Sequence, residues 1–136
     1  MDTIQLDPRD LVAEAEHAVT RGGVPVILSL SAFDVPRSVS VERDSARHTL
    51  RLTFQYVDNE QAVAETVNPD LIVWLGQNSG KVLALEVKEA PAWDIRVRIV
   101  HGVDEQLRRA TRDNQRLNYK VIRNVVSSKK LEPLLV

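Results

Sequence analysis

Cysteine is absent from this 136-residue chain, and long apolar runs are absent as well. The lack of cysteine excludes disulfides, thiolate catalysis and cysteine-ligated zinc or iron–sulfur sites. No apolar run approaches the ~18 residues that a membrane-spanning helix needs. The N-terminal segment MDTIQLDPRDLVAEAEH is acidic and lacks the apolar stretch of a signal peptide. We therefore expect a soluble, cytoplasmic protein that makes no membrane contact.

The composition is that of an ordinary globular domain, with 43% hydrophobic and 27% charged residues. Its length predicts a single domain over residues 1–136. The net charge of −1 conceals an asymmetry. Residues 1–95 carry 8 Lys/Arg against 15 Asp/Glu, a net of −7, whereas residues 96–136 carry 10 against 4, a net of +6. The basic part can neutralise the acidic part within the fold, or meet a phosphate backbone or an acidic partner.

The pattern along the chain predicts an α+β fold with an N-terminal helix and a mainly antiparallel β-meander sheet. Asp7-Pro8 can open a helix over residues 8–21, and a buried strand is predicted at 24–30. Alternating apolar and polar residues then indicate a meander core over 39–91. Its expected strands are 39–42, 49–57, 62–67 and a hairpin of 68–76 with 81–88 around the turn QNSG.

The C-terminal part, residues 101–136, is basic and predicted to be largely helical. An amphipathic helix is expected over 103–117, followed by a short strand at 119–126 (YKVIRNVV). The segment IRVRIV at 95–100 also alternates like a strand. Arg108, Arg112 and Arg116 recur at i, i+4 and i+8, which places them on one face of the expected helix.

The hairpin at 68–88 brings ionisable groups to one face of the sheet. Burying its two leucine- and valine-rich rows together leaves Asp70, Glu86 and Lys88 on the opposite face. In the simplest register Asp70 lies across from Lys88 and diagonal to Glu86. Trp74 shares this face, where it can stack on a base, pack under a helix or pack across a dimer interface.

Pro69-Asp70 and Glu86-Val87-Lys88 resemble the motif of PD-(D/E)XK nucleases. The resemblance implies that Asp70 and Glu86 would bind Mg²⁺ and that Lys88 would stabilise developing charge on a DNA phosphate. It further implies roles for a helix glutamine, Gln106, and for an acidic residue of the first helix, Glu14 or Glu16. The arginines at 108, 112 and 116 would then contact DNA.

Residues 39–91 also resemble a small bacterial family of unknown function, the domain numbered 2283 in that series. The matching stretches are Arg43-Asp44, Leu50-Arg51-Leu52, Glu65-Thr66, Leu71-Ile72-Val73-Trp74-Leu75 and the strand from Gly80 to Val87. Arg43 stands where the family has an aromatic residue, and His48 where it usually has a second aspartate. This resemblance implies a single meander and no activity, and it accounts for Glu86 without catalysis.

Two functional hypotheses follow from the sequence. The first is a non-catalytic interaction or regulatory module with no cofactor, whose partner is another protein or a second copy of the chain. Homodimerisation is expected because a half-exposed sheet leaves edges that need cover. The alternative is a Mg²⁺-dependent nuclease that acts on DNA through Asp70, Glu86 and Lys88.

Overall fold

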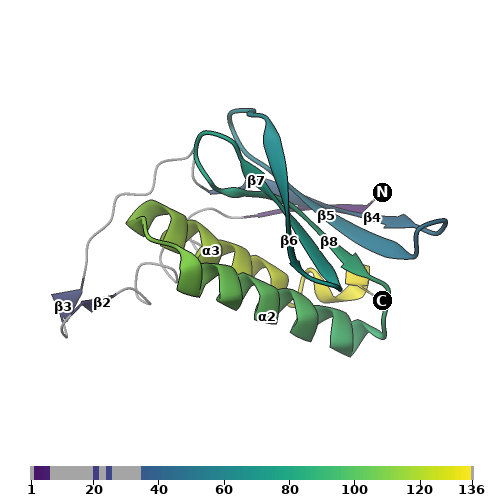
Figure 1. Cartoon of the computed structure of the whole chain (residues 1–136). Coiled ribbons are helices and arrows are strands. Elements are labelled where there is room, and N and C mark those ends of the chain that lie inside the picture. Colours follow the sequence, from purple (N-terminus) through teal and green to yellow (C-terminus); the bar gives the residue numbers. More distant parts are fainter. Residues whose placement is uncertain (1, 7–19, 22–23, 26–34, 136) are drawn as a thin grey trace.

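The computed structural model describes residues 2–6, 20–21, 24–25 and 35–135. Within these residues a six-stranded sheet and two helices form an α+β fold (Figure 1). The strands are β1 (Asp2–Gln5), β4 (Ser38–Asp44), β5 (Thr49–Gln55), β6 (Ala62–Asn68), β7 (Leu71–Gly76) and β8 (Val82–Lys88). A separate two-stranded hairpin joins β2 (Thr20–Arg21) to β3 (Val24–Pro25).

The order of strands in the large sheet is β1-β4-β5-β8-β7-β6, and all neighbouring strands are antiparallel. The predicted strands 39–42, 49–57, 62–67 and the hairpin of 68–76 with 81–88 are therefore confirmed. The prediction of a simple meander is wrong, because β5 pairs with β8 rather than with β6, the next strand along the chain. Residues 56–61 cross the ends of β7 and β8, which gives β5 to β8 a Greek-key arrangement.

Two helices cover one face of the sheet: α2 (Ala92–Arg109) and α3 (Asp113–Val126), followed by the 3-10 turn η1 (Glu132–Leu135) (Figure 1). The strands predicted at 95–100 and 119–126 are wrong, since both segments are helical. The single helix predicted over 103–117 is also wrong. The chain is extended at Ala110, with ψ 131°, and at Arg112, with ψ 138°, so α2 ends and α3 begins inside that range.

The N-terminal prediction is tested in part. Most of the helix expected at 8–21 lies outside the described residues, while Thr20–Arg21 forms a strand. Of the strand expected at 24–30, Val24–Pro25 is a strand and the remainder lies outside the described residues. The strand β1 was not predicted, and it pairs with β4 at one edge of the sheet.

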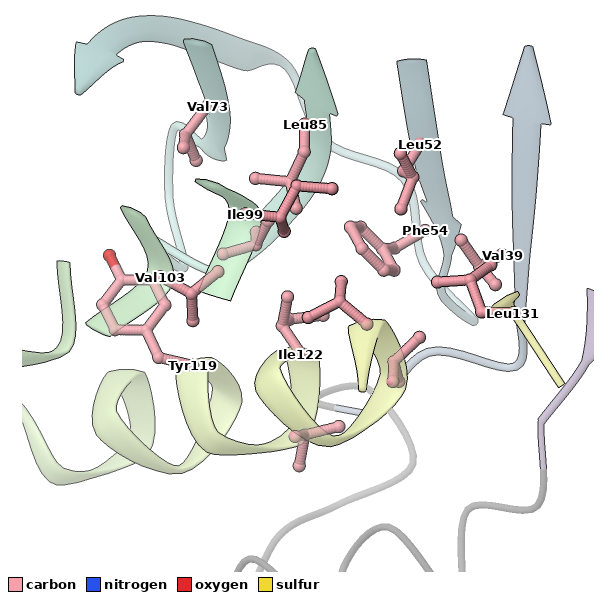
Figure 2. Packing of buried hydrophobic residues seen from close by; sticks show 14 of the residues in the cluster. Val39, Leu52, Phe54, Val73, Leu85, Ile99, Val103, Tyr119, Ile122 and Leu131 are labelled. Atoms are coloured by element: carbon pink, nitrogen blue, oxygen red, sulfur yellow. The ribbon is translucent and has the colours of Figure 1, made fainter. Parts of the chain in front are cut away.

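The core lies between the sheet and the two helices, as Figure 2 shows. Leu52, Val73 and Leu85 of the sheet meet Ile99 of α2 and Ile122 of α3, and all five are fully buried. Burying one such side chain contributes about 1.5–3 kcal/mol.

Close packing of α2 under β7 depends on Gly102, where an added Cβ would collide with the Leu71 side chain. Among the described residues, no helix is both long and apolar enough to cross a membrane.

Candidate functional site

The face of the sheet opposite the helices is a mixed polar surface, here called the helix-free face. Its central residues are Arg51 and Thr53 of β5, Ile72 and Trp74 of β7, and Ala84 and Glu86 of β8. Strand pairing aligns them in two rows across the sheet, Thr53–Ala84–Trp74 and Arg51–Glu86–Ile72. Ala84 lies between Thr53 and Trp74, and its small side chain leaves space on this face of the sheet.

Arg51 uses this room to stack on Trp74. Its guanidinium carbon lies 4.5 Å from the centroid of the indole ring, within the distance of a cation–π contact. Arg51 also lines two hollows in the surface, of about 410 and 270 Å³. Trp74 lines the smaller hollow and Glu86 the larger one. The stacked pair therefore stands between two concave regions of the same face.

The larger hollow is bounded by the turn that joins β4 to β5. The Asp44 carboxylate accepts hydrogen bonds from the amides of Ala46 and Arg47, both at 3.1 Å, and His48 adopts a left-handed φ of 54°. This turn places Arg47 Nη2 3.5 Å from Glu86 Oε1. The Glu86 side chain is 5% exposed, so its charge is held almost entirely inside the protein beside an arginine.

The structure brings the backbones of Asp70 and Lys88 together, in the register that the sequence predicts. The Lys88 amide donates to the Asp70 carbonyl at 3.0 Å, and the next pair is Leu71 with Val87. The two carboxylates do not meet on the common face that the sequence predicts, because each has a different partner. Asp70 Oδ1 lies 3.7 Å from Arg98 of α2, whereas Glu86 contacts Arg47 in the β4–β5 turn. The Lys88 side chain is exposed to solvent.

The other predicted site residues lie apart from this pair. Gln106 is buried in α2, and its side-chain nitrogen has no hydrogen-bond partner. Arg108 lies in the last turn of α2, Arg112 is at the N-cap of α3 and Arg116 lies within α3, so the interhelical turn breaks the expected stripe. Glu14 and Glu16 lie outside the described residues. Within the part of the chain that the structure describes, no group of three His, Asp or Glu residues could hold a metal ion.

A second polar cluster, the crossover network, was not predicted. Its members are Tyr56, Asp58 and Glu60 of the crossing segment, together with Ser79 and Lys81 of the β7–β8 turn. Glu60 accepts hydrogen bonds from the amides of Asn78 and Ser79, both at 3.0 Å, and from the Ser79 hydroxyl at 2.7 Å. Lys81 donates to Asp58 at 2.7 Å and lies over the Tyr56 ring.

These contacts change the acidity of both carboxyl groups. The hydrogen bond from Lys81 holds the pKa of Asp58 below its ordinary value. Burial alone would raise the pKa of Glu60, but the hydrogen bonds from Ser79 and Asn78 and the charge of Lys81 together lower it. Both groups are therefore stabilised as anions. The crossover network fixes the segment that makes the strand order non-sequential, which is a structural role.

The β7 and β8 part of the helix-free face follows from the sequence, since the alternation of the hairpin places both Trp74 and Glu86 on the face opposite its apolar rows. Arg51 was missed as the partner of Trp74, because nothing in the sequence indicates that β5 lies beside β8. No protein-family model, curated protein or solved structure matches this chain.

Proposed function

We propose that this chain is a non-catalytic interaction module that forms a homodimer through its helix-free face. The observation that supports this proposal is the Arg51–Trp74 stack, which stands between two hollows on the sheet face opposite the helices. Tryptophan and arginine are the residues that most often dominate the binding energy of protein interfaces. A cation–π pair presents both residues, already ordered, between two hollows of the same face.

The charges around this stack suit a second copy of the chain. Arginine and acidic residues alternate around the larger hollow, which is lined among others by Glu42, Arg43, Asp44, Arg47, Arg51 and Glu86. A two-fold interface brings the same patch together with itself, so the patch must carry both signs of charge. A surface of one sign would repel its own copy, whereas this one can pair arginines of one protomer with carboxylates of the other.

The ion pairs support an interaction module over the Mg²⁺-dependent nuclease. A nuclease of the PD-(D/E)XK type needs Asp70 and Glu86 to share one cation. In the structure each carboxylate contacts a different arginine, Arg98 and Arg47 respectively. An arginine beside a carboxylate competes with a cation for the same oxygens.

The test is the oligomeric state of purified protein, measured by sedimentation velocity from micromolar to submillimolar concentration. We expect a monomer–dimer equilibrium that Trp74→Ala and Arg51→Glu each weaken by roughly tenfold or more. The matched control is Trp93→Ala. Trp93 is the other tryptophan of the chain; it lies on α2 and is 73% exposed.

A monomeric wild-type protein across this range would refute the homodimer. Equal weakening by Trp74→Ala and Trp93→Ala would also refute the proposed face, because it would place the contact on the helical side as well. Circular dichroism of each variant verifies that the fold is kept.

A further inference from the structure

Four arginines surround the junction between α2 and α3, here called the basic corner. They are Arg108 and Arg109 at the end of α2, Arg112 in the turn, and Arg116 in α3. All four are exposed. Residues 107–117 contain these four arginines and one acidic residue, Asp113, which is a local net charge of +3. The corner lies at the end of the helical layer where α2 turns into α3 (Figure 1).

Like Arg37 and Arg51, the arginines of the basic corner lack carboxylate partners in the described part of the chain, whereas five other described arginines have one. Arg43, Arg47, Arg96, Arg98 and Arg123 each lie within 4.0 Å of an aspartate or glutamate. Among the described residues, no carboxylate lies within that distance of Arg108, Arg109, Arg112 or Arg116. Their guanidinium charge is therefore available to an external anion.

One of these side chains is held in place by a hydrogen bond, and a second lies close to the sheet. Arg116 Nε donates to the Ala110 carbonyl at 3.0 Å, which anchors it across the interhelical turn. The Arg112 guanidinium lies against Gly80 in the β7–β8 turn, and Gln115 donates to the Gly80 carbonyl at 3.2 Å. The corner is thus supported by the sheet, so binding an anion would order fewer side chains than an unsupported surface would.

We propose that the basic corner binds the phosphate backbone of a nucleic acid. A guanidinium presents a planar set of donors that matches two phosphate oxygens, and the corner offers arginine rather than lysine throughout.

An anionic membrane surface fits the corner less well. The large apolar side chains that are exposed in the described residues are Val57, Val63, Trp93 and Val97, and none lies in the corner. A peripheral membrane site usually adds apolar insertion to its charge. The inference does not depend on homodimerisation, because the basic corner and the helix-free face are made of different residues.

The test is fluorescence anisotropy of the full chain with a fluorescein-labelled DNA duplex of random sequence, at several salt concentrations. The informative variant is Arg108→Gln/Arg109→Gln/Arg112→Gln, which spares the anchored Arg116. Its matched control is Arg37→Gln/Lys129→Gln/Lys130→Gln, three exposed cations remote in sequence, with the same loss of charge.

We expect the corner variant to bind roughly tenfold or more weakly, and the magnitude of its log–log salt slope to fall by about 2 to 3, since each lost phosphate contact removes ~0.9. The control variant should change affinity by less than about threefold, because its cations make no phosphate contact at this site.

Equal losses in both variants would overturn the site, since net charge alone would then explain binding. No binding of the duplex at low salt would overturn the proposal outright. Polyglutamate or anionic phosphatidylserine vesicles that compete as well as unlabelled DNA would also overturn it, by identifying a general anion or lipid surface. Sedimentation of the same variants reports on the dimer separately.

Discussion

The two faces of the sheet differ in the kinds of residue that they carry. The helix-covered face is a continuous apolar layer, in which Leu52, Val73 and Leu85 are fully buried against α2 and α3. The helix-free face carries a buried carboxylate, Glu86, and an arginine stacked on Trp74. Stability should therefore come mainly from one face, which leaves the other free to carry residues chosen for binding. Substitutions on the two faces should separate stability from association.

The largest loss of stability is expected from Leu85→Ala on the helix-covered face. Leu85 is fully buried at the centre of the core, so truncation removes apolar burial and leaves a cavity. We expect the free energy of unfolding to fall by about 2–5 kcal/mol, measured by urea denaturation. Val63→Ala is the control, because Val63 is 54% exposed on the edge strand β6 and should lose less than about 0.5 kcal/mol. Similar losses in both variants would contradict the assignment of the core.

A smaller but substantial loss is expected from Glu60→Gln in the crossover network. The Glu60 carboxylate accepts three hydrogen bonds from the β7–β8 turn and lies 3.8 Å from the buried ammonium of Lys81. An amide can keep part of these contacts but loses the charge. We expect destabilisation of about 1–3 kcal/mol by urea denaturation. The matched control is Glu42→Gln, at an exposed position. An equal loss of unfolding free energy in both variants would contradict the structural role of the crossover network.

Much of the sheet follows from the sequence because strand alternation is a local signal. Leu50, Leu52 and Phe54 recur every second residue, and the pairing of Asp70 with Lys88 follows from the two apolar rows of the hairpin. The strand order does not follow, because it depends on the contacts of residues 56–61 with the β7–β8 turn. Asp58, Glu60 and Lys81 are each ordinary turn residues. Their structural role comes from contacts between segments that are distant in the sequence.

The helices show where local sequence patterns fail to predict the secondary structure. The segment at 119–126 contains β-branched residues that favour a strand, yet Val121, Ile122, Val125 and Val126 also recur at helical spacing and are all buried. Packing against the sheet selects the helix, since tertiary contacts override a weak propensity. For the same reason the sequence does not reveal the turn between α2 and α3. It predicts Arg108, Arg112 and Arg116 on one helix, whereas they lie around that turn.

The contribution of the crossover network should depend on pH. In the folded protein the pKa values of Asp58 and Glu60 lie below their ordinary values of 3.8 and 4.5. Their stabilising effect is therefore fully present above about pH 4.5 and is lost as the pH falls through the lowered values. We expect the difference in unfolding free energy between wild type and Glu60→Gln to shrink between pH 5 and pH 2. A difference that stays constant over this range would show that the Glu60 charge contributes nothing.

The smallest effect on stability is expected from Asp70→Asn, and it bears directly on the nuclease hypothesis. The Asp70 side chain is 45% exposed, and its partner Arg98 keeps a closer carboxylate, Asp94, at 2.9 Å. An exposed ion pair of this kind contributes about 0–1 kcal/mol, so urea denaturation should barely distinguish the variant from wild type.

If Asp70 were instead a metal ligand, Mg²⁺ would raise the stability of the wild type but not that of Asp70→Asn, since a bound cation stabilises the folded state. Plasmid cleavage that requires Mg²⁺ and disappears in both Asp70→Asn and Glu86→Gln would establish the nuclease and displace the interaction module. Because Asp70 and Glu86 contact different arginines, we expect Mg²⁺ to leave the unfolding free energy of all three proteins unchanged, with no cleavage by any of them.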